Sequence, residues 1–146
     1  MKRLSFLVGA VLFSTNLFAK SPYEKMAKEL SGDVAVDIKR IAIIPFASHN
    51  NIITDDGFIV SERLSTEIVN TKRFEVVERN ILYKVLEELK LQQSGIVDPS
   101  MAKEIGKVLS VDAIVTGTIV EISEKELEIN ARLIKTDTAE VVKATK

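Results

Sequence analysis

Residues 74–119 read FEVVERNILYKVLEELKLQQSGIVDPSMAKEIGKVLSVDAIVTGTI and contain the clearest signals of secondary structure in the chain. A short apolar run, Phe74–Val77, predicts a strand. A helical pattern over 81–94 follows, then a glycine, an Asp-Pro pair and a second helical pattern over 99–109. A strand that carries Val-Thr-Gly-Thr ends the stretch. Helices that alternate with strands in this way predict an α/β domain.

The helix ends follow from capping chemistry. Asn80 is predicted to cap the first helix, because its side chain can accept hydrogen bonds from free backbone N–H groups. Gly95 is predicted to end this helix, since glycine adopts a left-handed conformation at little cost. Asp98 and Pro99 suit the cap and the first position of the second helix. The apolar side chains expected to be buried are Ile81, Leu82, Val85, Leu86, Leu89, Ala102, Ile105, Val108 and Leu109.

From Asp112 onward the apolar pattern has a period of two, which predicts a β-hairpin. Its strands are expected over Ala113–Ile122 and Leu127–Lys135, joined by a turn at Ser123–Glu126, and a short last strand over Glu140–Val142. In the first strand, one face carries Ile114, Thr116, Thr118, Val120 and Ile122. In the second strand, one face carries Leu127, Ile129, Ala131 and Leu133, and the wet face carries Glu128, Asn130 and Arg132.

Three further elements are expected before Phe74. Ser21-Pro22-Tyr23-Glu24 predicts the start of a short helix over 22–30. Val34–Phe46 predicts a strand, with an interruption around Lys39-Arg40 as the alternative, and Ile41–Phe46 is its part expected in the sheet. Pro45 marks the exit of the strand, because proline cannot donate a ladder hydrogen bond. A polar loop, Ser48–Asp56, then leads into a helix over 57–71 that Thr54, Asp55 or Asp56 can cap and that buries Val60, Leu64 and Ile68. The predicted order is α-β-α-β-α-α-β-β-β, in one domain.

The first 19 residues are typical of a cleaved secretory signal peptide. Lys2 and Arg3 precede the apolar run Leu4–Phe13, and a more polar stretch leads to Ala19, after which cleavage is expected. The run is too short to span a bilayer as a mature helix. An uncleaved amphipathic or buried helix is the alternative. We therefore expect a signal peptide over 1–19 and a domain over 20–146.

Composition narrows the possible partners. The sequence has no cysteine, so the hydrophobic core must hold the fold without disulfides, and a lipid anchor on a mature N-terminal cysteine is not expected. Loss of Lys2 and Arg3 would lower the formal net charge from −1 to −3. An acidic domain with few aromatic residues argues against a nucleic-acid partner. Because both signs of charge are interspersed, no polybasic membrane patch is predicted.

The sequence predicts no catalytic, cofactor-binding or metal-binding residue. His49 is the only histidine, and with only Asp55 and Asp56 near it a metal ion would lack most of its usual ligands. Ser48 adjoins His49 but lacks the Gly-x-Ser-x-Gly turn of a hydrolase nucleophile. Gly117 is a lone strand glycine, which indicates close backbone packing or a bulge. The pair Glu78-Arg79 is interpreted as a solvated strand end.

Five segments resemble one family of bacterial envelope proteins. They are IAIIPF (41–46), RFEVVER (73–79), VLEELKLQQSGIVDPSMAKEIGKVL (85–109), DAIVTGTI (112–119) and INARLIKTDTAEVV (129–142). The run LQQSG before Asp-Pro and the Val-Thr-Gly strand are the specific part. Together they resemble the CsgG/HfaB family, with its FlgO-like members and activators of penicillin-binding proteins.

The resemblance implies an α/β domain of two to three layers, with three to four helices packed on a mixed sheet. It also implies a non-catalytic component of the cell envelope. With the expected signal peptide, we expect the protein in the periplasm, either free there or at the outer membrane through a bound partner. Three departures limit the resemblance. The turn at Ser123–Glu126 and the end at Lys146 leave no length for the membrane hairpins of the family's secretion channels. The anchor cysteine is absent, and Ala139 replaces the usual glycine of a turn.

The favoured interpretation of function is an assembly or interaction protein that binds an envelope protein of unknown identity. A secretion-channel subunit and an activator of a cell-wall synthase are the alternatives within the family. An enzyme that uses the loop from His49 to Asp56 is disfavoured by the missing motifs. The surfaces expected to carry binding are Ser48–Asp56, the helix end at 91–95 and the wet face of Glu128, Asn130 and Arg132. Self-association is expected with Gln92 and Gln93 near the contact.

Overall fold

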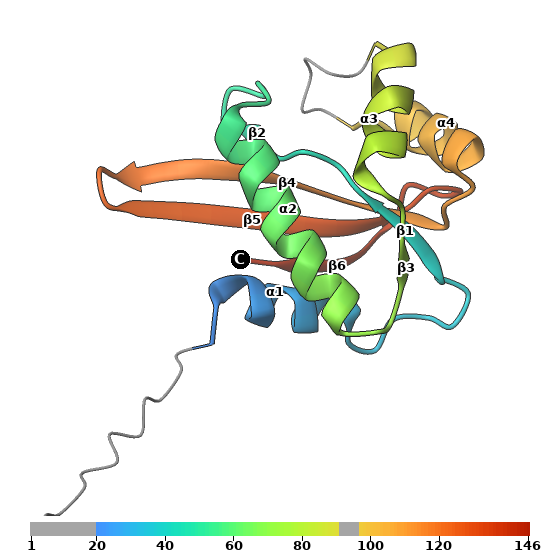
Figure 1. Ribbon diagram of the computed structural model, residues 1–146. Helices are drawn as coiled ribbons and strands as arrows, with labels where there is room; N and C mark the ends of the chain where they lie inside the picture. The colour runs from blue at the N-terminus through green and yellow to red at the C-terminus, as the bar shows by residue number, and fades with distance from the viewer. Residues whose placement is uncertain (1–19, 91–96) are drawn as a thin grey trace, which may run out of the picture.

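The computed structural model describes residues 20–90 and 97–146. The expected signal peptide, the Gly95 helix end and the pair Gln92-Gln93 lie outside the described residues. The elements are α1 (Pro22–Ser31), β1 (Arg40–Ile43), β2 (Ala47–Ser48), α2 (Asp55–Asn70), β3 (Glu75–Val76), α3 (Arg79–Glu88), α4 (Pro99–Leu109), β4 (Ala113–Ser123), β5 (Glu126–Lys135) and β6 (Val141–Thr145). This confirms the expected order, with the two-residue strand β2 added inside the polar loop (Figure 1).

One mixed sheet runs through the domain, with the strand order β3-β1-β4-β5-β6. Strand β1 is parallel to both β3 and β4, whereas β4, β5 and β6 are antiparallel to one another. Strand β1 ends at Ile43, earlier than the expected Phe46, and Pro45 lies between it and β2, which pairs with Thr118 and Ile119 of β4. The β4–β5 turn is short, because Ser123 pairs with Glu126.

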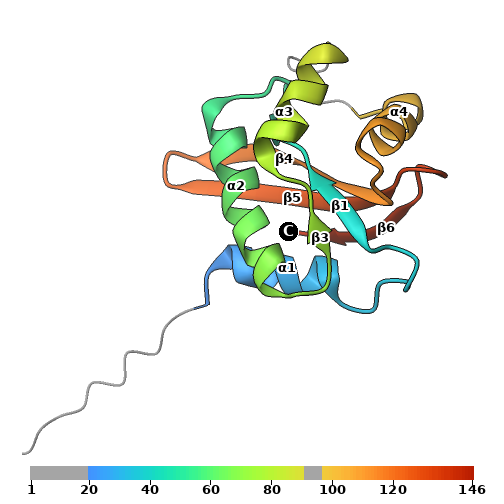
Figure 2. The same ribbon diagram turned by 45° about the vertical axis from the view of Figure 1, so that its right-hand side comes forward.

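Helices cover both faces of the sheet. On one face, α1 and α2 enclose a core that includes Leu30, Leu64, Ile68, Val115 and Leu133. On the other face, α3 and α4 enclose a second core that includes Leu82, Leu86, Ile105, Leu109 and Ile114. Figure 2 shows α1 below the sheet and α3 and α4 above it. The burial expected for Leu64, Ile68, Leu82, Leu86, Ile105 and Leu109 is confirmed.

The expected helix caps are confirmed at three helices. The side chain of Ser21 accepts from the N–H of Tyr23, that of Thr54 from Gly57, and that of Asp98 from Met101. The cap predicted at Asn80 is wrong. Helix α3 begins at Arg79, and Glu78 caps it through an oxygen that accepts from the N–H groups of Asn80 and Ile81.

Two side chains expected in the core are exposed. Ile81 is 54% exposed and Val108 is 50% exposed. Each stands one residue, or about 100° around the helix, from the buried Leu82 and Leu109. The helices contact the sheet through narrow stripes, so an apolar residue one position away faces solvent. Helix α3 also ends at Glu88, before the expected end at residue 94.

The strand expected over 34–39 is absent, and a loop takes its place. The guanidinium of Arg73 donates to the carbonyl oxygens of Val34, Ala35 and Ile38. The carboxylate of Asp112 accepts from the N–H groups of Lys39 and Arg40, each at 2.9 Å. These side chains satisfy backbone groups that a strand would otherwise pair in a ladder.

Candidate interaction surface

The β4–β5 register divides the hairpin into two chemically different faces. The pairs Val115–Leu133, Gly117–Ala131 and Ile119–Ile129 face α1 and α2. The pairs Thr116–Arg132, Thr118–Asn130 and Val120–Glu128 lie on the other face. The residues of β4 expected to share a face with Ile114 therefore do so. Beyond Ile114, however, this face is the wet one, shared with Glu128, Asn130 and Arg132.

Helices α3 and α4 cover this second face only at one end. Ile114 and Ile134 belong to the core beneath them, whereas Thr116, Thr118 and Val120 are half-buried and belong to neither core. Figure 1 shows the hairpin extending well beyond α3 and α4 to a turn at the far end of the molecule. We call the uncovered part of this face the open half of the sheet; it consists of Thr116, Thr118, Val120, Glu128, Asn130 and Arg132.

A hollow of about 220 Å³ lies on the open half of the sheet. Thr116, Thr118, Asn130 and Arg132 line it from the strands. Asn51 lines it from the loop after β2, and Val97 lines it from the segment before α4. The hollow thus joins two surfaces expected from sequence, the loop Ser48–Asp56 and the wet hairpin face. The third expected surface, 91–95, lies outside the described residues, although Val97 comes shortly after it.

Gly117 allows the backbone of β4 to pack closely against the Phe46 ring on the side of the sheet opposite the hollow. A Cβ atom at this position would lie 2.1 Å from the carbonyl oxygen of Asn130 and 2.4 Å from Cε2 of Phe46. Both distances are far below van der Waals contact, and Phe46 is completely buried. The close backbone packing expected at Gly117 is therefore confirmed. Phe46 holds this part of β4 in place from the α1/α2 side.

Two charged side chains of β5, Glu128 and Arg132, lie in or next to the hollow, and they differ in their contacts. Glu128 accepts from Asn130 Nδ2 at 3.0 Å and pairs with Lys146 Nζ at 3.1 Å. These contacts, that of Asn130 first, lower the pKa of Glu128 below its ordinary value. In the part of the chain that the structure describes, no carboxylate lies within ion-pair distance of Arg132. The hollow therefore combines hydrogen-bonding side chains with one uncompensated cation.

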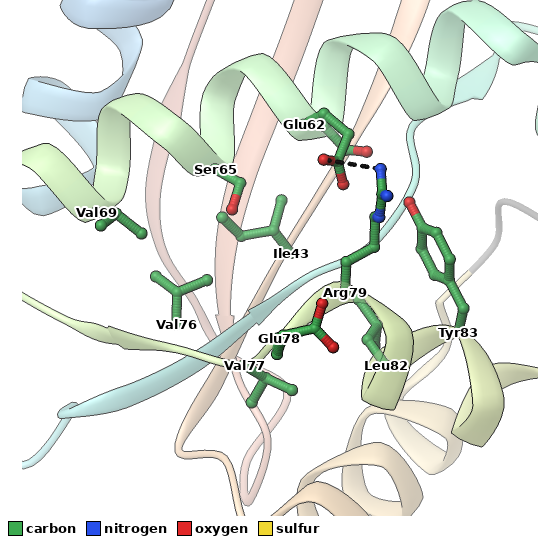
Figure 3. Close-up of a pocket in the computed structure, with 11 residues that line it drawn as sticks. Ile43, Glu62, Ser65, Val69, Val76, Val77, Glu78, Arg79, Leu82 and Tyr83 are labelled. Atoms are coloured by element: carbon green, nitrogen blue, oxygen red, sulfur yellow. Dashed lines mark ion pairs between the residues drawn. The ribbon is translucent and has the colours of Figure 1, made fainter.

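A second concavity, of about 230 Å³, separates α2 from α3 (Figure 3). Ile43, Val76 and Leu82 form its apolar floor. Arg79 reaches across from α3 and pairs with Glu62 of α2 at 3.1 Å. Glu78 and Arg79 are solvent-exposed as expected, but they do not end a strand, because Glu78 caps α3 and Arg79 begins it. No local sequence pattern predicts the Arg79–Glu62 ion pair, because its partners lie on separate helices.

An aromatic contact also connects α2 and α3. The rings of Tyr83 and Phe58 meet edge to face, with centroids 5.4 Å apart. Burial is the main cause that raises the pKa of Tyr83 above its ordinary value. The charged side chains of this second concavity pair with each other or cap α3. This concavity is therefore part of the packing contact between α2 and α3, and it is a weaker candidate for binding than the open half of the sheet.

Other expected features can be placed plainly. His49 is exposed in the loop between β2 and α2. Over residues 20–90 and 97–146, no group of three or more acidic, histidine or cysteine side chains could hold a metal ion. Nor does that part of the chain contain a helix of the length and apolarity that a membrane crossing requires.

Comparisons with known proteins identify a family and a fold. The family model for the curli production assembly/transport component CsgG matches residues 40–126, from β1 into β5. The sequence matches no curated protein. The fold is similar to the LpoB C-terminal domain from Escherichia coli, with a TM-score of 0.64 at 14% identity, covering 84% of this chain and 91% of that one.

Two further solved structures share the fold. The NMR structure of Escherichia coli LpoB has a TM-score of 0.67 at 13% identity, covering 100% of this chain and 79% of that one. Lipoprotein GNA1162 from Neisseria meningitidis has a TM-score of 0.58 at 11% identity, covering 73% and 78%. At such low identity these likenesses carry the fold and nothing about partners.

Proposed function

The chain belongs to the CsgG family, and from this premise we propose that it is a non-catalytic interaction protein of the bacterial cell envelope. In this proposal it binds a protein partner through the open half of the sheet and takes part in the assembly of an envelope structure. Export is part of the proposal. The charged, apolar and polar segments of residues 1–19 support cleavage after Ala19.

One observation carries this proposal. The open half of the sheet exposes a hollow and a row of polar side chains that neither hydrophobic core uses. A solvent-facing half of an otherwise covered sheet is free to vary without loss of folding, and binding residues gather on such surfaces. The edge of the hollow is also formed by a loop, which adds an adaptable border to a rigid floor.

Site-specific photo-crosslinking in cells tests the proposal. Val120→p-benzoylphenylalanine places the probe on the open half beside the hollow. Thr66→p-benzoylphenylalanine, on the exposed side of α2, is the matched control. We expect a crosslinked product from position 120 and none from position 66. Equal products from both positions, or none from position 120, would contradict the proposal.

The identity of that product decides between the alternatives. A cell-wall synthase would support an activator, and a fibre or channel component would support a role in secretion. A product of twice the chain's mass would support self-association. Mass spectrometry of the purified protein would test export separately, with an N-terminus at Lys20 expected and a retained Met1 contradicting it.

A further inference from the structure

We propose that the hollow on the open half of the sheet receives an acidic side chain of the protein partner, and that Arg132 is its anchor. This inference rests on the proposed function, because it assigns a chemistry to the partner at the same surface. The observation behind it is a hydrogen-bonding hollow that contains one cation and is lined by no carboxylate.

The surroundings of Arg132 leave its charge uncompensated. Across the sheet it pairs with Thr116 of β4 and Ala144 of β6, both neutral. Its neighbours on the same face of β5 are Asn130 and Ile134, also neutral. Glu128, farther along, is already engaged by Asn130 and Lys146. Residues 1–19 and 91–96, outside the described part, contain no aspartate or glutamate. Among residues 20–90 and 97–146, no carboxylate is therefore within ion-pair distance of this guanidinium.

The rest of the hollow fits a carboxylate on an aliphatic stem. A guanidinium binds a carboxylate through two parallel hydrogen bonds, which fixes both orientation and distance. Thr116 and Thr118 offer hydroxyl donors, and Asn51 offers an amide. Val97 and Ile134 give the hollow an apolar wall against which methylene groups can pack. A lysine or arginine side chain would meet an unfavourable charge at the same place.

The direct test is an NMR titration of the 15N-labelled full chain with capped amino acids. N-acetyl-glutamate amide should shift the amide signals of Thr116, Thr118 and Asn130. N-acetyl-glutamine amide, which has the same shape without the charge, should bind about tenfold more weakly or not at all. Equal shifts with the glutamine compound, or equal shifts with inorganic phosphate, would overturn the proposal, because the hollow would then not select a carboxylate side chain.

Substitutions make the assignment to Arg132 specific. Arg132→Gln should abolish the glutamate-induced shifts, and Arg132→Lys should retain part of them. Arg63→Gln, an exposed arginine on α2, is the matched control and should leave them unchanged. Unperturbed signals elsewhere in each spectrum would show that the variant is folded. If Arg132→Gln keeps the full response, Arg132 is not the anchor and the proposal fails.

The same substitution in the photo-crosslinking assay separates this inference from the proposed function. With the probe at position 120, Arg132→Gln should reduce the crosslinked product about tenfold. A full product with Arg132→Gln would refute the acidic anchor and leave the interaction surface standing. No product even with Arg132 present would refute the interaction surface itself. A product that consists of a second copy of this chain would also overturn the inference of a separate acidic partner.

Discussion

Adjacent residues of the β4–β5 hairpin lie on opposite faces of the sheet, one packed in the core and the other open to solvent. On the face toward α1 and α2, Gly117 and Leu133 are enclosed between β2, the helices and the rest of the core. One residue along each strand, Thr118 and Arg132 stand on the open half of the sheet with no helix above them. Folding therefore constrains one set of residues tightly and leaves the other set available for recognition.

The largest effect should come from Leu133→Ala. Leu133 is completely buried, so its truncation removes apolar contacts and leaves a cavity. We expect the free energy of unfolding to fall by about 2–5 kcal/mol, measured by urea denaturation. Arg132→Ala, next in sequence on the opposite face, should change it by no more than about 0.5 kcal/mol. Similar losses from both variants would show that the open half is part of the core.

Gly117→Ala should have the next largest effect. The new methyl group would overlap with the Asn130 carbonyl and the Phe46 ring, so backbone or ring must move. Overpacking of this kind costs about 1–3 kcal/mol in the free energy of unfolding, sometimes more. The neighbouring Thr118→Ala on the open half is the control, with an expected change within about 0.5 kcal/mol. A thermal melt of both variants tests the prediction, and an unchanged Gly117→Ala protein would contradict the packing described.

A smaller, stabilising effect is expected from Ala139→Gly. Ala139 has φ 59°, in the left-handed region that disfavours residues with a Cβ atom. Glycine should relieve this strain, against a larger loss of backbone entropy on folding, for a net gain of about 0.5–1 kcal/mol. Chemical denaturation measures the gain. Loss of stability would mean that the packing of the Ala139 methyl group outweighs the backbone strain.

The sequence predicts the core well and the long-range contacts poorly. Capping signals at Ser21, Thr54 and Asp98 are local, so they place three helix starts correctly. The loop at 34–39 depends on Arg73 and Asp112, which are distant in sequence, and its apolar pattern is therefore mistaken for a strand.

The solvent exposure of the open half could not be predicted from the sequence either. Ile114 and Ile122 lie on the same face of β4, but Ile114 is buried and Ile122 is exposed. Because both residues are apolar, the sequence does not show that the face becomes solvent-exposed between them. Asn51 lines the hollow because β2 pairs with β4 and brings the following loop beside the hairpin. Strand β2 is only two residues long. No local pattern predicts so short a strand.

The smallest effect concerns pH and the ion pair between the exposed Asp37 and the half-buried Lys135, whose charged atoms lie 2.9 Å apart. The hydrogen bond from Lys135 lowers the pKa of Asp37, and the same bond raises the pKa of Lys135. Stabilisation from Asp37 is thus present above its unfolded pKa and is lost as pH falls through its lower folded pKa. Stabilisation from Lys135 is present below its unfolded pKa and is lost as pH rises through its higher folded pKa.

Asp37→Asn should therefore flatten the acid limb of the stability profile slightly. Because the Asp37 carboxylate is exposed to solvent, the change should be close to the limit of detection. Asp33→Asn, at a second exposed aspartate of the same loop, is the comparison variant. Urea midpoints measured across the acid range test this, and a large loss at neutral pH would show that the pair has a structural role.

The central claim, that binding uses the open half and not the α2–α3 concavity, is tested most directly by one bulky charge at each surface. Thr118→Arg blocks the hollow, and Ser65→Arg blocks the concavity between α2 and α3. Chemical crosslinking in intact cells, followed by immunoblotting, records partner complexes without choosing a surface in advance. We predict that Thr118→Arg keeps its melting temperature and loses the complex, while Ser65→Arg retains the complex. The opposite result, a complex lost only with folded Ser65→Arg, would contradict the claim.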